Sequence, residues 1–313
     1  MFRIVRGSNR NWNVHWCTYW STGHEHRCGS CTACNWRMAR TRRQRNTNFV
    51  TLADELLAVA VGLARAAGDM ALAGRKAGLH NVQTKSTATD MVTEFDRASE
   101  KLIVEGMRER RPLDAIVGEE GASIAGTSGI TWYIDPIDGT TNFLYDLPAW
   151  AVSIGAEDSD GPLAGVVYIP ALGEMFSAIR GGGAFLNDSP IRSNGISEVS
   201  QALVCTGFSY SAEQRTIQAQ RVSKFIHQIR DIRRAGAAAI DLCFVACGRI
   251  DAYFEENLHQ WDIAAGILIA HEAGCRSGDF AGNAPRPAEI LTTAPAIFDQ
   301  LSGLIMAASA KKE

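Results

Sequence analysis

The chain has 313 residues, of which 46% are hydrophobic and 21% are charged, with a formal net charge of −3. This is an ordinary globular composition, long enough for two domains or one large one. The charge gives no reason to expect nucleic acid as a partner, and we expect neither a membrane-spanning run nor a secretory signal.

The first 48 residues differ from the rest. They hold nine arginines, one acid, four tryptophans, four cysteines and three histidines. The spacing Cys28-x-x-Cys31-x-x-Cys34 could bind zinc, but no second Cys/His set completes such a site. Low periodicity and high charge favour a disordered basic extension, or sequence upstream of a true start at Met38. Metal or nucleic-acid binding is the alternative for this segment.

The other cysteines lie mostly among apolar residues and are typical of small buried hydrophobic side chains. Free thiols of this kind indicate a reducing compartment, so we expect a cytoplasmic protein. They are Cys205, Cys243, Cys247 and Cys275.

The folded body is expected to start near Thr51 with an amphipathic helix that ends at Gly74 or Gly78. The charges of Arg65 and Asp69 argue against a membrane span. The apolar positions at helical spacing are Leu52, Leu56, Val59, Leu63, Ala66 and Met70.

A second helix is predicted after Thr93, and Pro112 stops the chain beyond it. Thr93 and Asp96 resemble a capping box, in which each residue satisfies a free backbone N–H at the helix start. Capping alone is sufficient reason for an acid at Asp96. The inward positions are Phe95, Leu102, Ile103 and Met107.

A short apolar strand, Ala115 to Gly118, delivers Glu119 and Glu120 before a Gly/Ser/Ala-rich segment, 121–129, that reads as a flexible loop. An exposed pair of glutamates is usually only part of the solvated surface, without a specific role. A pair that directly follows a buried strand has a fixed position and is therefore a candidate for a site.

The most informative stretch runs from Trp132 to Phe143. Its apolar start predicts a buried strand that ends at Pro136, because proline has no N–H to donate. Asp135 and Asp138 flank this proline, and carboxylates held so close repel each other unless a cation lies between them. The carbonyl of Ile137 adds a hard oxygen donor.

The end of this stretch predicts a tight turn and a helix start. Gly139 permits the turn, and Thr140 or Thr141 begins a helix whose free N–H groups attract phosphate. This one segment therefore offers metal ligands, a hydroxyl group and an anion-binding site. Metal-assisted transfer of a phosphoryl group to water requires groups of these kinds.

Two patterns follow along the chain. Consecutive strands predict an antiparallel sheet, the triple glycine 181–183 predicts a hairpin turn, and Asn194-Gly195 is a candidate domain boundary. The strands are expected at 151–156, 163–169 and 175–179. Strands and helices then alternate, which predicts an α/β layer. Its strands are expected at 203–206, 250–255 and 290–293, and its helices at 212–229, 237–248, 261–273 and 296–308.

The unbroken string from Asp135 to Phe143 resembles the first signature of the inositol monophosphatase family, a group of lithium-sensitive, metal-dependent phosphatases. The segment from Trp261 to Gly266, with Glu272-Ala273-Gly274, resembles the second signature. The resemblance covers about residues 51–308. It implies a layered α-β-α-β-α sandwich, with an antiparallel-sheet half at 49–195 and an α/β half at 196–313.

The resemblance also implies roles for individual residues. Asp96 pairs with Thr140, which orients the attacking water together with Glu119, while Glu120 is structural and Lys85 and Asp90 lie near the active-site loop. The implied metal ligands are Glu119, Asp135, the Ile137 carbonyl, Asp138 and Asp262. The implied substrate contacts are Asp138, Gly139, Thr140, Gly236, Ala237, Ala238, Glu255 and Asp262.

On this resemblance the chain is expected to be a Mg²⁺-dependent phosphomonoesterase that hydrolyses inositol-1-phosphate with a metal-activated water. Thr141 favours this branch, because relatives that act on nucleotides or histidinol phosphate often carry lysine there. The alternatives are histidinol phosphate, fructose-1,6-bisphosphate or 3′-phosphoadenosine 5′-phosphate as substrate, or a regulatory RNA-associated role. A homodimer is expected, and neither membrane nor nucleic-acid binding is expected of the folded body.

Overall fold

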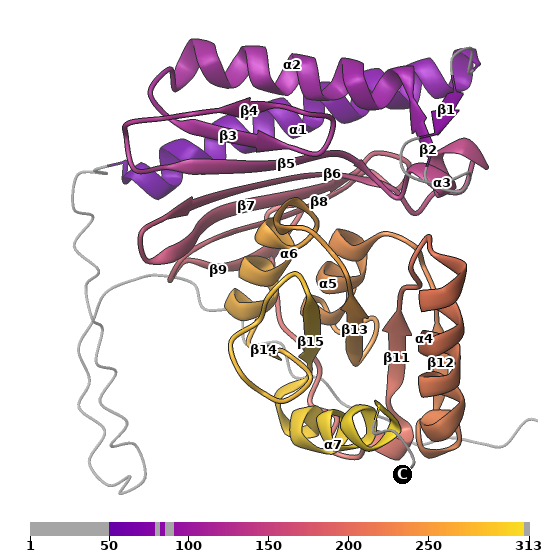
Figure 1. Ribbon diagram of the computed structural model, residues 1–313. Helices are drawn as coiled ribbons and strands as arrows, with labels where there is room; N and C mark the ends of the chain where they lie inside the picture. Colours follow the sequence, from indigo (N-terminus) through magenta and orange to yellow (C-terminus); the bar gives the residue numbers. More distant parts are fainter. Residues whose placement is uncertain (1–49, 79–81, 85–90, 310–313) are drawn as a thin grey trace, which may run out of the picture. The chain divides into compact units, whose positions relative to one another are not determined.

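Five layers of secondary structure stack in the computed structural model, which describes residues 50–78, 82–84 and 91–309 (Figure 1). Residues 49–313 form one compact unit. The predictions for the Cys-rich segment 1–48, for Lys85 and for Asp90 concern residues outside the described part.

Helices form the outer layers and the central layer of this body (Figure 1). Two helices cover one face of the first sheet, two lie between the sheets, and two cover the second sheet. The predicted α-β-α-β-α sandwich is therefore confirmed. In that order the helices are α1 (Leu52–Ala77) and α2 (Glu94–Arg110), α5 (Ala238–Ala246) and α6 (Gln260–Glu272), and α4 (Ala212–Phe225) and α7 (Phe298–Ser309).

The first sheet has eight strands in the order β10-β9-β8-β7-β6-β5-β3-β4. Every pair is antiparallel except β3 with β5, which run parallel. Its strands are β3 (Ala115–Gly118), β4 (Ser123–Ile124), β5 (Thr131–Asp138), β6 (Ala151–Asp158), β7 (Gly161–Ile169), β8 (Glu174–Ile179), β9 (Gly183–Leu186) and β10 (Ser189–Ile191). A separate antiparallel pair joins β1 (Val82–Thr84) to β2 (Met91–Thr93).

The second sheet has five strands in the order β12-β11-β13-β15-β14 and is mixed. The first three run parallel, and β15 is antiparallel to both of its neighbours. Its strands are β11 (Leu203–Thr206), β12 (Asp231–Arg233), β13 (Ala252–Glu256), β14 (Arg276–Gly278) and β15 (Glu289–Thr293). The expected boundary near Asn194 falls on the segment that joins the two sheets. A division into separate domains there stays a prediction.

Strand β5 does not end at Pro136, so that prediction was wrong. The strand continues to Asp138, and its pairing with β6 is irregular: Asp135 lies opposite Ser153, and Asp138 lies opposite Ala151. Pro136 therefore sits in a bulge, where a missing N–H removes no ladder hydrogen bond. The bulge also redirects the chain between the two acids.

Other elements differ from the expectation mainly where strands are short. Strand β4 lies within the segment expected to be a flexible loop, and the helix expected over 212–229 ends at Phe225, followed by one 3₁₀ turn at Ile226–Gln228. Six strands of three or four residues were not anticipated, because so few residues carry no usable periodicity. They are β1, β2, β9, β10, β12 and β14.

Helix α1 is long and apolar enough to cross a membrane by length and composition alone. It has 26 residues and a most apolar window with a mean hydropathy of 1.6, so the expectation that no run reaches this length was wrong. Core helices of globular proteins pass the same test, and 39% of that window is buried here. Its buried residues, including Leu56 and Leu63, join the core between α1, α2 and the eight-stranded sheet.

The predicted turn at the triple glycine is confirmed as the connection between β8 and β9. The Glu272 carboxylate at the end of α6 accepts hydrogen bonds from the N–H groups of Gly181 and Gly183, at 2.7 and 2.8 Å. This glutamate of the second signature therefore fixes a hairpin of the first sheet to the central helix layer.

Candidate active site

A cavity of about 570 Å³ lies between the bulge of β5 and the start of α6. All but one of the predicted site residues line it, together with the loop 207–211. The exception is Asp96, which lies beside Thr140. The lining residues that were predicted are Glu119, Asp135, Ile137, Asp138, Gly139, Thr140, Gly236, Ala237, Ala238, Glu255 and Asp262.

Asp135 lies at the base of this cavity, with 2% of its surface exposed. One carboxylate oxygen accepts a hydrogen bond from the backbone N–H of Ile137 at 3.1 Å, which holds the side chain inside the bulge. Burial, and then repulsion from Glu119, Asp138 and Asp262, raise the pKa of Asp135 well above its usual value. A cation among these carboxylates would relieve the repulsion.

Asp138 connects the two halves of the body. Its two carboxylate oxygens accept hydrogen bonds from the N–H groups of Ala238, at 3.2 Å, and Ala239, at 2.7 Å. These are the first residues of α5, whose own N-cap residue provides no side-chain bond. Asp138 thus caps a helix 100 residues further along the chain. Burial, followed by the nearby charge of Asp262, raises the pKa of Asp138.

Thr140 lies between two acceptors on the other side of the bulge. Its hydroxyl oxygen is 3.1 Å from a carboxylate oxygen of Asp96 and 3.1 Å from the carbonyl oxygen of Ile137. The hydroxyl can therefore donate its one hydrogen bond to either acceptor. Asp96 also accepts the N–H of Thr93 in the predicted capping box, which is confirmed. Burial raises the pKa of Asp96 to about 6, although its hydrogen bonds to Thr93 lower it.

The turn at Gly139 requires glycine. Its φ is 88°, and a Cβ there would lie 2.9 Å from the carbonyl oxygen of Ala149. The turn leads into the short helix α3 (Thr140–Leu144), as predicted. Arg75 of α1 donates to the carbonyls of Phe143 and Leu144, at 2.7 and 3.1 Å, and so satisfies the end of this helix.

The opposite wall of the cavity is built by β13 and α6. The hydroxyl of the buried Tyr253 donates to Glu255 at 2.7 Å. Burial raises the pKa of Glu255 to about 7, opposed by the Tyr253 hydrogen bond and by the charge of Arg234. Asp262 lies in the first turn of α6, as predicted, and accepts the N–H of His259 at 2.6 Å.

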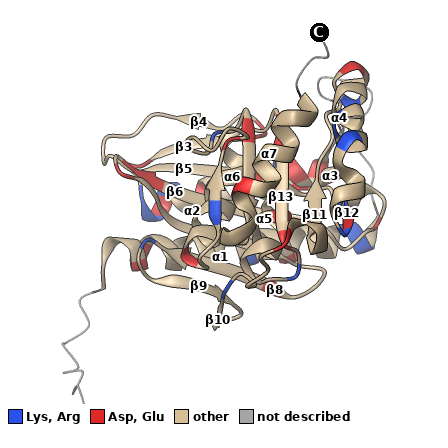
Figure 2. Cartoon of the chain, turned by 90° about the horizontal axis from the view of Figure 1, so that it is seen from below, with Lys and Arg blue, Asp and Glu red and all other residues tan. Residues whose placement is uncertain are grey.

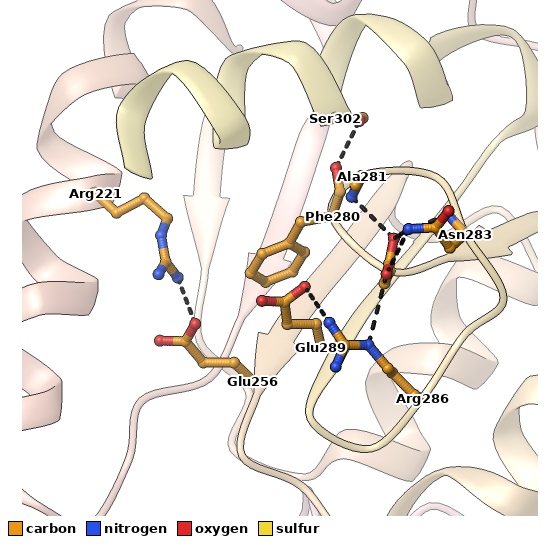
Figure 3. A network of polar contacts seen from close by, with 9 residues as sticks. Arg221, Glu256, Phe280, Ala281, Asn283, Arg286, Glu289 and Ser302 are labelled. Carbon is orange, nitrogen blue, oxygen red and sulfur yellow. Dashed lines mark hydrogen bonds and ion pairs between the residues drawn. The ribbon is translucent and has the colours of Figure 1, made fainter. Parts of the chain in front are cut away.

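This second wall is supported from behind by segments distant in sequence (Figure 3). Arg221 of α4 pairs with Glu256 at 2.9 Å and lies over the Phe280 ring. Both charged side chains are nearly buried, with 11% and 12% exposed. In the loop between β14 and β15, the backbone carbonyls at 287 and 288 accept the N–H groups of Leu258 and Asn257.

Several residues at the site were not singled out from the sequence. Arg234, His259 and Trp261 line the cavity, and the last two stack with ring centroids 4.6 Å apart. Ser99 and Glu100 support the first wall from α2. The available signal for these two was their spacing of three and four residues from Asp96, which places all three on one helix face.

The donor set fits a hard divalent cation by its chemistry, because it consists of carboxylate and carbonyl oxygens around a cavity in which the carboxylates repel one another. Across residues 50–78, 82–84 and 91–309, however, no three His, Cys, Asp or Glu side chains converge as a formed metal site. The candidate ligands are arranged around the cavity and are engaged with backbone N–H groups, as at Asp138 and Asp262.

Comparisons with known proteins by sequence and by structure agree on the family to which this chain is similar. The inositol monophosphatase family matches residues 52–313. An inositol-1-monophosphatase of Mycobacterium bovis is 44% identical over 232 residues, which cover 70% of this chain and 79% of that protein. A Nus factor SuhB of Pasteurella multocida is 40% identical over 229 residues, covering 72% and 86%. The crystal structure of the extragenic suppressor protein suhB from Bartonella henselae superposes with a TM-score of 0.76 at 34% identity, covering 80% of this chain and 98% of that one.

Proposed function

Because the chain belongs to the inositol monophosphatase family, we propose that it is a Mg²⁺-dependent phosphomonoesterase that hydrolyses inositol-1-phosphate to inositol and phosphate. The observation that carries the proposal is the single cavity lined by Glu119, Asp135, Asp138 and Asp262 together with the turn at Gly139. Hard oxygen donors beside a helix start suit a phosphate and its metal ions.

In this proposal Glu119, Asp135, Asp138, Asp262 and the Ile137 carbonyl hold Mg²⁺. Bound Mg²⁺ would lower the pKa of a coordinated water and neutralise charge on the phosphate. The charges of Glu119, Asp138 and Asp262 all raise the pKa of Asp135, so Asp135 is near enough to each of them to share bound cations with them.

The chain's own residues would then position the water and manage its proton. Thr140 and Glu119 orient the water, and Asp96 accepts a proton through the Thr140 hydroxyl, 3.1 Å away. A pKa of about 6 for Asp96 suits a proton acceptor near neutral pH. The backbone N–H groups of Gly139 and Thr140 steady the phosphate.

The other end of the cavity would bind the polyol. Glu255, held by Tyr253, lines the same cavity as Gly236 and Ala237. A buried carboxylate and backbone groups suit hydroxyls of a sugar-like ring. The N–H of Ala238 donates to Asp138 in this structure. Ala238 would therefore contact the substrate through its Cα and Cβ atoms and not through its N–H.

The test is phosphate release with Mg²⁺ from inositol-1-phosphate, histidinol phosphate, fructose-1,6-bisphosphate and 3′-phosphoadenosine 5′-phosphate. We expect the highest kcat/KM with inositol-1-phosphate. A clear preference for another member of the panel would replace the substrate and keep the reaction class. No release from any of them would reject the enzymatic proposal.

A second candidate function is a regulatory, RNA-associated role, which the relatives named Nus factor SuhB favour. Most basic side chains gathered on α4 and β12 (Figure 2) are engaged within the protein, in carbonyl hydrogen bonds or ion pairs. They are Arg215, Arg221, Lys224, Arg230 and Arg233. We therefore assign RNA binding, on this alternative, to residues 1–48. A chain that begins at Asn48 should then lose RNA binding in a filter assay and keep phosphatase activity.

We also propose a cytoplasmic homodimer. The four body cysteines are free thiols and three of them are buried, which suits a reducing compartment. Sedimentation equilibrium of the full chain is expected to give twice the chain mass, and a monomer at micromolar concentration would reject the dimer.

A further inference from the structure

We propose that Glu100 of α2 is a positioning residue that fixes Glu119, and that α2 serves as the common support for the metal-binding segments of the first wall. The inference rests on the proposed function only in taking Glu119 as a metal ligand. It assigns a role to a buried acid that lies outside the cavity lining.

Glu100 is 7% exposed and holds the turn that follows β3. One carboxylate oxygen accepts the N–H of Glu120 at 2.8 Å, and the other accepts the N–H of Ala122 at 2.9 Å. The amide of Glu120 belongs to the peptide group that directly follows Glu119. Fixing this amide therefore fixes the backbone from which the Glu119 side chain projects.

The fit between α2 and this turn is close. A Cβ at Gly118 would lie 2.3 Å from the Glu100 carboxylate, so only glycine at the end of β3 leaves room for the acid. The strand end and the carboxylate are thus matched to each other. The turn has little freedom to move while the Glu100 carboxylate is in place.

Two further residues on the same face of α2 hold the other metal-binding segment. Asp96 lies 3.1 Å from the Thr140 hydroxyl, and the Ser99 hydroxyl donates to the carbonyl of Pro136 at 3.2 Å. Positions 96, 99 and 100 are spaced by three and four residues, which places them side by side on a helix. Asp96 and Ser99 are fully buried.

One rigid element therefore contacts both the β3 turn and the β5 bulge, and it adds to the direct pairing of β3 with β5, in which the Glu119 N–H donates to the Ile134 carbonyl at 3.1 Å. The capping box at Thr93 fixes the start of α2, and Ile103 and Met107 bury its middle against the first sheet. A divalent cation shared by Glu119 and Asp135 needs these two segments at a fixed separation. Residues that orient metal ligands typically affect metal affinity about 10- to 100-fold.

The side-chain chemistry at position 100 is specific. Two backbone N–H groups need two acceptor oxygens, and glutamine offers only one. Its NH₂ group would face the second N–H and repel it. Glu100→Gln, which is nearly equal in volume, should therefore release or rotate the turn while leaving the apolar contacts of α2 unchanged.

The test measures binding of Mn²⁺, as a paramagnetic probe for the divalent site, to the full chain by electron paramagnetic resonance. We expect Glu100→Gln to raise the dissociation constant about 10- to 100-fold and to raise the Mg²⁺ concentration for half-maximal phosphate release in parallel. Glu105→Gln is the matched control, because Glu105 lies on the same helix, is 64% exposed and pairs with Lys101. It should leave both quantities unchanged.

A folded Glu100→Gln variant with wild-type Mn²⁺ affinity would overturn the inference, and so would a full chain that binds no Mn²⁺. Glu100→Asp keeps both carboxylate oxygens on a side chain shorter by one methylene and should give an intermediate Mn²⁺ affinity. If the glutamine variant does not fold, wild-type Mn²⁺ affinity in Glu100→Asp would overturn the inference. Phosphate release is measured separately from Mn²⁺ binding, because it tests the proposed function and Mn²⁺ binding tests this inference. A Glu100-dependent Mn²⁺ site in a chain that hydrolyses no substrate would reject the proposed function and keep this inference.

Discussion

The two walls of the cavity are held in different ways. In the first wall, α2 and the β5 bulge lie within residues 93–142, and one face of α2 contacts both metal-binding segments through Asp96, Ser99 and Glu100. In the second wall, β13 and the start of α6 are held by side chains from distant segments. Arg221 pairs with Glu256, and Gln260 donates to Glu157 at 2.6 Å from 103 residues away.

The two walls therefore differ in how many separate segments of the chain hold them in place. Except for the hydrogen bonds of Asp138 to α5, the first wall is held by contacts within a short stretch of chain. The second depends on several separate elements that must all be in place, including the β14–β15 loop (Figure 3). Apart from the proposed metal ligand Asp262, we therefore expect substitutions in the first wall to affect metal binding and kcat, and substitutions in the second to affect stability and KM.

The largest effect is expected for Asp138→Asn, which removes a proposed metal ligand. We expect kcat/KM to fall at least about 100-fold, because the lost charge stabilisation acts in a buried site. The fold should survive with a modest loss of stability, since asparagine keeps one of the two oxygens that accept the N–H groups of Ala238 and Ala239. Steady-state kinetics and thermal unfolding measure the two outcomes.

Asp146→Asn is the control, because Asp146 is exposed just beyond α3 and lies 3.8 Å from Arg75. It should keep full activity. Near-normal turnover of Asp138→Asn would show that the metal assignment is wrong.

Next in size is Arg221→Met, which leaves Glu256 nearly buried without its cation. The expected cost is about 3 kcal/mol in the free energy of unfolding, together with a raised KM, because Glu256 lines the cavity. Denaturant unfolding and substrate titration measure these changes.

The exposed pair of Arg233 with Asp231 provides the comparison, with 54% and 52% of the side chains exposed. Arg233→Met should cost no more than about 1 kcal/mol. Equal losses from both substitutions would contradict the view that the second wall depends on the Arg221 contact.

A smaller effect, dependent on pH, is expected for Asp241 of α5, which accepts a hydrogen bond from the Cys205 thiol. Burial raises the pKa of Asp241 to about 8 from 3.8. The folded protein therefore holds a proton that the unfolded chain releases, and wild-type stability falls as pH rises from about 4 to 8.

Asp241→Asn has no such loss, so it should gain stability relative to wild type as the pH rises through this window. Urea unfolding at pH 5 and pH 8 tests this, with the exposed Asp299→Asn as control. A stability difference that is the same at both pH values would refute the buried, protonated state.

The smallest effect is expected for Ser99→Ala. It removes the hydrogen bond to the Pro136 carbonyl and should cost about 1 kcal/mol in stability, with only a few-fold change in kcat. Ser302→Ala, which removes a comparable hydroxyl-to-carbonyl bond at 2.7 Å from Phe280, is the matched control and should leave kcat unchanged. A rise in KM without any change in kcat for Ser99→Ala would place Ser99 outside the first wall's function.

The sequence was sufficient for the elements with strong local signals. The long helices α1, α2 and α6, the strand that carries Glu119 and the turn at Gly139 all follow from periodicity, caps and glycine placement. The layered fold and the set of site residues came from two unbroken signatures. The failures were of three kinds: strands too short to show a period, a proline at which β5 continues because a bulge absorbs it, and the long apolar helix α1, which reaches the length of a membrane span.

By itself, then, the sequence predicted which residues line the cavity, because that information lies in short contiguous motifs. Only the tertiary structure decided how they are held. That Asp138 caps α5, that Glu100 holds the turn after Glu119, and that Arg221 supports Glu256 are pairings of residues 20 to 101 positions apart. Such pairings depend on which buried polar group meets which unsatisfied donor after the layers pack, and no local pattern specifies that choice.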